Sequence, residues 1–135
     1  MTILELFYLF VLSCFFSLEN ESIKEIPSIY IKPEVREIFY DYPLIIENGY
    51  VFLDNKNKAQ GFFDPIPPEA NFDRQNIIIF AWKGSGQDKI DYEYDNIGKI
   101  HNFVYKRGLT KDHKEHVKII SINKEEKWLF HRVLD

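Results

Sequence analysis

The stretch that decides the fold is residues 77–82, which read Ile-Ile-Ile-Phe-Ala-Trp. Asn76 precedes this run, and Lys83 and Gly84 follow it. A short run that is apolar at every position, rather than at every second position, is typical of a strand whose two faces are both covered. We therefore predict that residues 77–82 form the central strand of a sheet.

The next segment along the chain alternates instead. Residues 90–95 read Ile-Asp-Tyr-Glu-Tyr-Asp, and successive side chains of a strand point to opposite faces. This pattern predicts a strand with Tyr92 and Tyr94 on one face and the three acids on the other face, toward water. We favour a solvated face over a calcium site, because strand spacing holds the carboxylates about 7 Å apart and calcium needs them to converge from a loop.

A short amphipathic helix is predicted for residues 33–42, ahead of the central strand. Pro33 suits the first turn of a helix, and Pro43 ends it. Apolar residues at the i, i+3, i+4, i+7 spacing share one face of this helix, which we expect to pack across the sheet. These residues are Val35, Ile38, Phe39 and Tyr42.

An Asn-Gly pair at residues 48 and 49 predicts a β-hairpin, because these residue types accept the positive φ angles of a type I′ turn. The apolar segments 44–47 and 50–53 are the two expected strands. Residues 55–58 read as a second polar turn. We therefore expect residues 60–63 to return as a third strand.

The second half of the sequence indicates a meander. Residues 98–107 suit a helix or a strand, and we favour a strand because the segments that follow have strand patterns. Residues 117–122 and 127–134 are apolar and flank a polar turn, which predicts a C-terminal hairpin. The fold class is thus α+β: residues 19–135 form a single domain with an antiparallel sheet of five to seven strands and one short helix, preceded by an apolar N-terminal helix.

Residues 3–18 are apolar or aromatic except at Glu5, Ser13 and Ser17. As a helix these sixteen residues rise about 24 Å, less than the roughly 30 Å of a bilayer core. Residues 1–18 therefore predict a signal or membrane-anchor segment, which gives a secreted or cell-envelope protein whose membrane contact is limited to this segment. The alternative is a soluble intracellular structural protein in which residues 1–18 form a core helix.

Cys14 is the only cysteine, which excludes an intramolecular disulfide. Residues 11–14, Val-Leu-Ser-Cys, resemble the lipid-attachment box of bacterial lipoproteins. That resemblance implies lipidation of Cys14 and a mature protein that begins there, tethered by acyl chains. The alternative is that Cys14 is one more apolar residue of an apolar run.

The charge balance argues against nucleic acid as a partner. The chain has 17 basic and 21 acidic residues, a formal net charge of −4. Binding to phosphates needs a clustered basic excess. Aromatic residues make up 16% of the sequence, and we expect most of them in the core rather than on a stacking surface.

His113 and His116 form the closest pair among the four histidines. If Thr110 caps a short helix, these two residues could share a metal ion with Asp112, or with the more distant His131, as a third ligand. The zinc-protease pattern needs histidines four residues apart, and here they are three apart. A solvated loop or helix end is the simpler interpretation, and a metal-dependent hydrolase is the alternative.

No nucleophile elbow, phosphate loop or cofactor motif is present in the sequence, so an enzyme is uncertain and a non-enzymatic role is favoured. No cofactor is expected. We expect an exported binding or inhibitory protein, similar in kind to an immunity protein, that acts through a surface. Its partner is expected to be a protein, and acidic residues favour a basic one. The candidate binding residues are Asp88, Asp91, Glu93 and Asp95.

Overall fold

The computed structural model describes residues 22–41 and 49–133. In this part of the chain seven strands form a four-stranded sheet, with the order β1-β6-β3-β2, and a three-stranded sheet, with the order β4-β5-β7. The structure is thus mostly β with few helices, consistent with the α+β class. The strands are β1 (Ile23–Ile26), β2 (Val51–Leu53), β3 (Gln75–Gly84), β4 (Lys89–Asp95), β5 (Ile100–Lys106), β6 (Lys114–Asn123) and β7 (Lys127–Val133).

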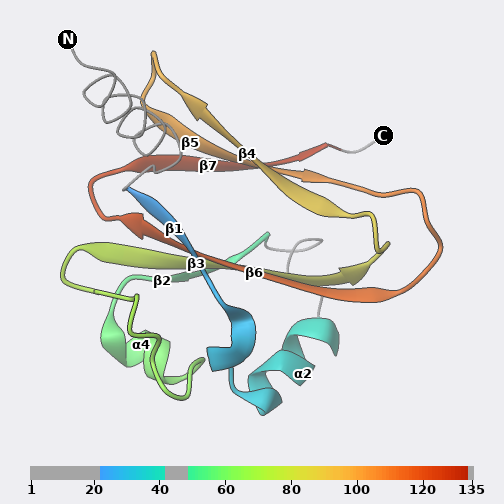
Figure 1. The fold of residues 1–135 in the computed structure, drawn as a ribbon, viewed down its shortest axis with the longest axis horizontal. Helices are drawn as coiled ribbons and strands as arrows, with labels where there is room; N and C mark the ends of the chain where they lie inside the picture. Colours follow the sequence, from blue (N-terminus) through green and yellow to red (C-terminus); the bar gives the residue numbers. More distant parts are fainter. Residues whose placement is uncertain (1–21, 42–48, 134–135) are drawn as a thin grey trace, which may run out of the picture.

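The elements form three layers (Figure 1). The three-stranded sheet lies over one face of the four-stranded sheet. The helices lie against the opposite face, so the four-stranded sheet is the middle layer. The helical elements are η1 (Ser28–Tyr30), α2 (Pro33–Asp41) and α4 (Lys56–Gln60).

Strand β3 contains residues 77–82 and lies between β6 and β2, which confirms the predicted central strand. Its side chains alternate between two cores, and both faces are covered as the unbroken apolar run indicated. One set packs toward the helices and consists of Ile77, Ile79 and Ala81. The other set packs toward the three-stranded sheet and consists of Ile78, Phe80 and Trp82.

Aromatic rings fill the space between the two sheets. Phe80 of β3 lies with its ring centroid 5.5 Å from that of Phe103 on β5 and 5.2 Å from that of Phe130 on β7. Both Phe80 and Phe103 are fully buried. Burial of a phenylalanine side chain contributes about 1.5–3 kcal/mol, so this contact is a main attachment between the sheets. The expectation that the aromatics serve the core agrees with this packing.

Helix α2 begins at Pro33, as predicted, and packs against β3. Phe39 is 3% exposed, and its ring stacks on Phe62 at a centroid distance of 6.0 Å. The predicted apolar face is only partly right, because Ile38 is 57% exposed while Val35 packs on the core. The buried face of this short helix is therefore narrower than the predicted apolar face.

The polar segment at residues 55–58 does not form a turn that leads into a third strand. It belongs to α4, and the Asn55 side chain caps this helix by accepting a hydrogen bond from the Lys58 amide at 2.9 Å. An asparagine at this position satisfies an amide that the first helical turn leaves free. Ala59 anchors the helix in the core, and of residues 60–63 only Phe63 makes a β-bridge, to Ile31.

The predicted strand at residues 98–107 is confirmed as β5, but the predicted C-terminal hairpin is wrong. Strands β6 and β7 both exist, yet they lie in different sheets. β6 pairs with β1 and β3, whereas β7 crosses to the other sheet and pairs with β5 in parallel. In this position the alternating inward residues of β7, Trp128 and Phe130, pack against the core between the sheets.

Several predictions lie outside the described residues: the apolar helix and signal segment at 1–18, lipidation of Cys14, and the hairpin strand at 44–47. At the described end of that hairpin, Gly49 has a φ of 84°, the conformation that the Asn-Gly pair predicted. Within residues 22–41 and 49–133, no helix combines the length and apolarity needed to cross a membrane.

Candidate functional site

Three of the four predicted binding residues lie together on β4. Asp91, Glu93 and Asp95 point away from the core, while Tyr92 and Tyr94 point toward it, as the alternation predicted. Glu93 and Asp95 are exposed, and Asp91 is half-buried. The side chain of Asp95 also orders the turn after β4, because Oδ1 accepts hydrogen bonds from the amides of Ile97 and Gly98 at 3.0 and 3.1 Å.

The fourth residue, Asp88, does not belong to this acidic surface, and its expected exposure is wrong. It is 7% exposed and lies in the loop between β3 and β4. Its carboxylate accepts hydrogen bonds from Trp82 Nε1 at 3.2 Å, the Tyr105 hydroxyl at 3.1 Å and the Gly108 amide at 2.6 Å. Buried carboxylates need such donors, so Asp88 holds two loops together rather than facing a partner.

Asp91 is partly neutralised by lysines within the same sheet. Its carboxylate lies 2.7 Å from Lys106 Nζ and 3.7 Å from Lys89 Nζ. The hydrogen bond from Lys106 is the main reason that the pKa of Asp91 is lowered, and the same contact raises the pKa of Lys106. The uncompensated acidity of β4 is therefore concentrated at Glu93 and Asp95.

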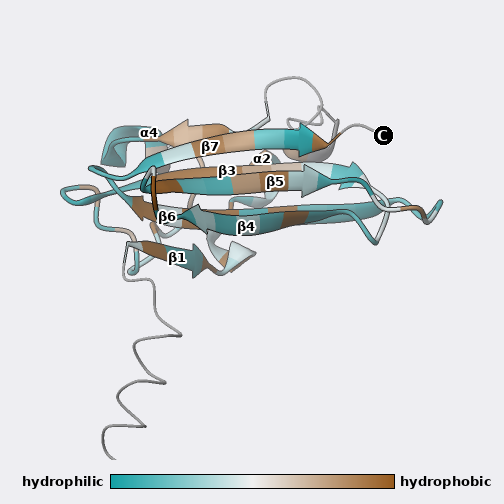
Figure 2. Ribbon diagram, turned by 90° about the horizontal axis from the view of Figure 1, so that it is seen from above, coloured by the Kyte–Doolittle hydropathy of each residue, from teal (hydrophilic) through white to brown (hydrophobic). Residues whose placement is uncertain are grey.

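The outward side chains of β4, β5 and β7 together form a surface that we call the outer face. Figure 2 looks onto this sheet and shows hydrophilic and hydrophobic residues mixed along its strands. Leu129 and Val133 are 48% and 43% exposed there. The outer face consists of Lys89, Asp91, Glu93, Asp95, Ile100, Asn102, Val104, Lys106, Lys127, Leu129, His131 and Val133.

The residues of the metal hypothesis are not brought together. Residues 110–113 form a loop and β6 begins at Lys114, so the helix on which that hypothesis depends is not formed. His116 stacks on the Trp82 indole at a centroid distance of 4.6 Å, and its Nε2 donates to the Ser85 carbonyl at 2.8 Å. Asp112 accepts from the Gly86 amide at 3.0 Å. Among the described residues, no group of three His, Cys, Asp or Glu side chains is placed to hold a metal ion.

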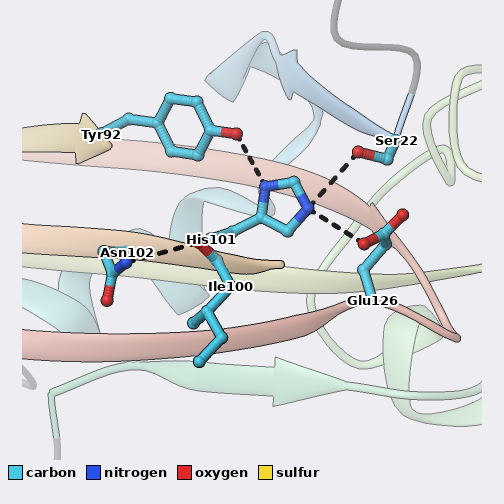
Figure 3. A network of polar contacts seen from close by, with 6 residues as sticks. All are labelled: Ser22, Tyr92, Ile100, His101, Asn102 and Glu126. Atoms are coloured by element: carbon cyan, nitrogen blue, oxygen red, sulfur yellow. Dashed lines mark hydrogen bonds and ion pairs between the residues drawn. The ribbon is translucent and has the colours of Figure 1, made fainter. Parts of the chain in front are cut away.

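Sequence reasoning missed the most buried polar cluster of the described chain, which centres on His101 (Figure 3). His101 is 0% exposed. Its Nδ1 lies 2.7 Å from the Tyr92 hydroxyl, and its Nε2 lies 3.3 Å from Glu126 Oε2 and 3.4 Å from Ser22 Oγ. The strand alternation could have placed His101 inward with Phe103, but nothing local indicated its distant partners.

The geometry of this cluster assigns the imidazole protons. A carboxylate oxygen only accepts hydrogen bonds, so Nε2 carries a proton and donates to Glu126. With this single ring proton, Nδ1 accepts from the Tyr92 hydroxyl. The order phenol, imidazole, carboxylate is also that of a base-activated nucleophile. Here, however, the ring is fully enclosed, and the cluster reaches the surface only through the partners of the ring, Tyr92, Glu126 and Ser22. The cluster therefore links β4 and β5 to Ser22, directly before β1, and to Glu126, directly before β7.

Comparisons with known proteins give this chain no family: no protein-family model, curated protein or solved structure matches it.

Proposed function

We propose that this chain is an exported or envelope-tethered protein that binds or inhibits another protein through the outer face, without catalysis. The observation that supports this most is the unequal covering of the two sheets. Both faces of the four-stranded sheet are packed, whereas none of the described elements packs on the outer face of the three-stranded sheet. A protein interface is about as apolar as the rest of a protein surface, so a face on which Leu129 and Val133 are half-exposed is compatible with one.

The charges of this surface favour a protein that presents basic groups. Glu93 and Asp95 lie at the β4 edge without a lysine opposite them on β5, where their register partners are Asn102 and Ile100. Exposed carboxylates increase the association rate of a basic partner. Nucleic acid is disfavoured by the net charge of −4.

The proposal of export depends on the apolar run at residues 3–18. A segment of this length and composition, followed by polar residues, is typical of a secretory signal, and Cys14 offers a lipid tether. N-terminal sequencing of the natural protein tests this. A chain that begins at Cys14 or near Glu19 supports export, whereas an intact Met1 in the soluble fraction contradicts it.

Cross-linking in cells tests the binding role. A photo-cross-linking phenylalanine analogue replaces Leu129 at the outer face, and the same analogue replaces Lys56 on α4 as a control. We expect the Leu129 position to form one discrete protein adduct that disappears with Glu93→Lys, and the Lys56 position to form none. If neither position forms an adduct, or if Glu93→Lys leaves it unchanged, the proposed function is wrong.

A further inference from the structure

The outer face carries acidic groups on one edge strand and basic groups on the other. On β4 the outward residues are Asp91, Glu93 and Asp95, with Lys89 at the start of the strand. On β7 they include Lys127 and His131 and no acid. Such a surface can dock onto a second copy of itself if a symmetry operation brings the acidic strand of one copy opposite the basic strand of the other.

The strand register shows that these charges lie in common rows. Asp95 pairs with Ile100 of β5, which in turn pairs with Lys127 of β7. In a second row Asp91 pairs with Val104, which pairs with His131. Each of these rows therefore runs from an acid through an aliphatic side chain to a basic group.

A two-fold axis parallel to β5 maps every row onto the same row of a second copy and exchanges β4 with β7. Asp95 then faces Lys127 of the second copy, and Ile100 and Val104 each meet their own counterparts at the centre. An axis perpendicular to the strands would place Asp95 opposite Lys89 of the second copy, but it would also bring Asp91 near Glu93 at two symmetry-related positions, and like charges at an interface are unfavourable. The axis parallel to β5 places no acid opposite an acid. The charge pattern therefore selects one arrangement.

We propose that the occupant of the outer face is a second copy of this chain, docked face to face about a two-fold axis parallel to β5. This inference rests on the proposed function and names the partner for the same surface. The basic groups that the acidic strand was expected to recognise are then those of β7.

Lys106 lies near the proposed axis and meets Lys106 of the second copy, so its charge must be balanced within the chain. The structure provides this balance, because Asp91 lies 2.7 Å from Lys106 Nζ. The pKa of this lysine is raised by Asp91, which shows that the pairing favours the charged form.

The size of the face predicts a weak dimer. Strands of seven residues span about 24 Å, and three strands spaced about 4.8 Å apart give a face well below the roughly 800 Å² per partner of a standard stable interface. We therefore expect association that depends on protein concentration and weakens as salt screens the charge pairs.

Charge reversal with complementation tests this arrangement in the full chain. Two copies with different tags are expressed together, and both carry the photo-cross-linker at position 129. Glu93→Lys places a lysine between Lys127 and His131 of the second copy, and Lys127→Glu places an acid beside its Glu93. Each variant alone is expected to lower the yield of the two-tag adduct about tenfold, because each adds like-charge contacts at both symmetry-related positions.

Expressing Glu93→Lys with Lys127→Glu leaves one of the two symmetry-related contacts with its native charges and sets the new lysine diagonal to the new acid at the other, so the two-tag adduct should largely return. The matched control is Glu69→Lys in the connector between α4 and β3, which makes the same charge change away from the outer face and should leave the yield unchanged. If the mixed pair does not recover, self-docking is overturned.

The mass of the adduct distinguishes this inference from the proposed function. An adduct with twice the mass of the free chain supports self-docking. An adduct with a different protein, lost with Glu93→Lys, overturns self-docking and leaves the binding function in place. No adduct at all contradicts both.

Discussion

Trp82 Nε1 donates a hydrogen bond to Asp88 Oδ2 at 3.2 Å, inside the core between the sheets. The same carboxylate oxygen accepts from the Tyr105 hydroxyl at 3.1 Å. Asp88 thus joins β3 to β5 at the end of the sandwich. Gly84 makes this possible, because a Cβ at that position would clash with the Asp88 carboxylate.

Removing this carboxylate should destabilise the fold. Asp88→Ala leaves the Trp82 indole, the Tyr105 hydroxyl and the Gly108 amide without their acceptor. We expect the free energy of unfolding to fall by about 2–4 kcal/mol, measured by urea denaturation. Asp73→Ala, at an exposed loop position, is the control and should change stability by less than about 0.5 kcal/mol. Equal effects of the two variants would contradict the structural role of Asp88.

The phenol of Tyr105 should lose its proton at a higher pH than an ordinary tyrosine does. Burial of the phenol, with a smaller contribution from its hydrogen bond to Asp88, raises the pKa of Tyr105 from 10.0 to about 12. Because the folded protein holds this proton more tightly than the unfolded chain, the associated stability is fully present below pH 10.0 and is lost as the pH rises toward about 12. The phenolate absorbance of Tyr105→Phe, subtracted from that of the native protein, isolates this group. A difference curve centred at the ordinary value would show that the prediction is wrong.

The sequence predicts best where a pattern is local. The apolar run at 77–82 and the alternation at 90–95 both contain enough information to assign a strand and its faces. The partition into two sheets is not local. The polar turn at residues 124–126 does not indicate whether β7 returns beside β6 or crosses to β5, where Trp128 and Phe130 pack against the core between the sheets.

The candidate site shows the same division. The outward direction of Asp91, Glu93 and Asp95 follows from strand alternation alone. The burial of Asp88 does not, because it depends on donors that come from β3, β5 and the loop after β5. A charged residue in a polar loop is expected to be exposed unless such partners are known.

The Asp91–Lys106 pair should be visible in the titration of Asp91. The pKa of this carboxyl is lowered from 3.8, chiefly by the hydrogen bond from Lys106. Its contribution to stability is therefore present above pH 3.8 and is lost as the pH falls through the lower, folded-state pKa. Lys106→Met should return the pKa toward 3.8, followed by NMR of the side-chain carboxyl carbon. Lys89→Met should have a smaller effect, since Lys89 Nζ is 3.7 Å away. Equal shifts in both variants would argue against Lys106 as the main cause.

The His101 cluster predicts a fixed tautomer and a cost for its removal. Nitrogen NMR of the imidazole should show the proton on Nε2, because Glu126 accepts there and Tyr92 donates to Nδ1. His101→Ala should lower the free energy of unfolding by about 2–4 kcal/mol, since it leaves a cavity and removes one hydrogen bond of the Tyr92 hydroxyl. His131→Ala, at an exposed position on β7, is the control with a small effect. A proton found on Nδ1 would contradict the assigned hydrogen bonds.

Removing one buried hydroxyl group should stabilise the fold. Ser121 of β6 is 0% exposed, and its Oγ has no hydrogen-bond partner within the described chain. An unsatisfied buried hydroxyl costs about 1–3 kcal/mol, so Ser121→Ala should raise the free energy of unfolding by roughly 1 kcal/mol once the lost packing is included. Ile119→Val, two residues earlier on the same face, removes a methylene group from the packed core and should lower the free energy of unfolding by about 1 kcal/mol. Urea denaturation should give changes of opposite sign in the free energy of unfolding of the two variants. A loss of stability in Ser121→Ala would mean that the hydroxyl is hydrogen-bonded in solution.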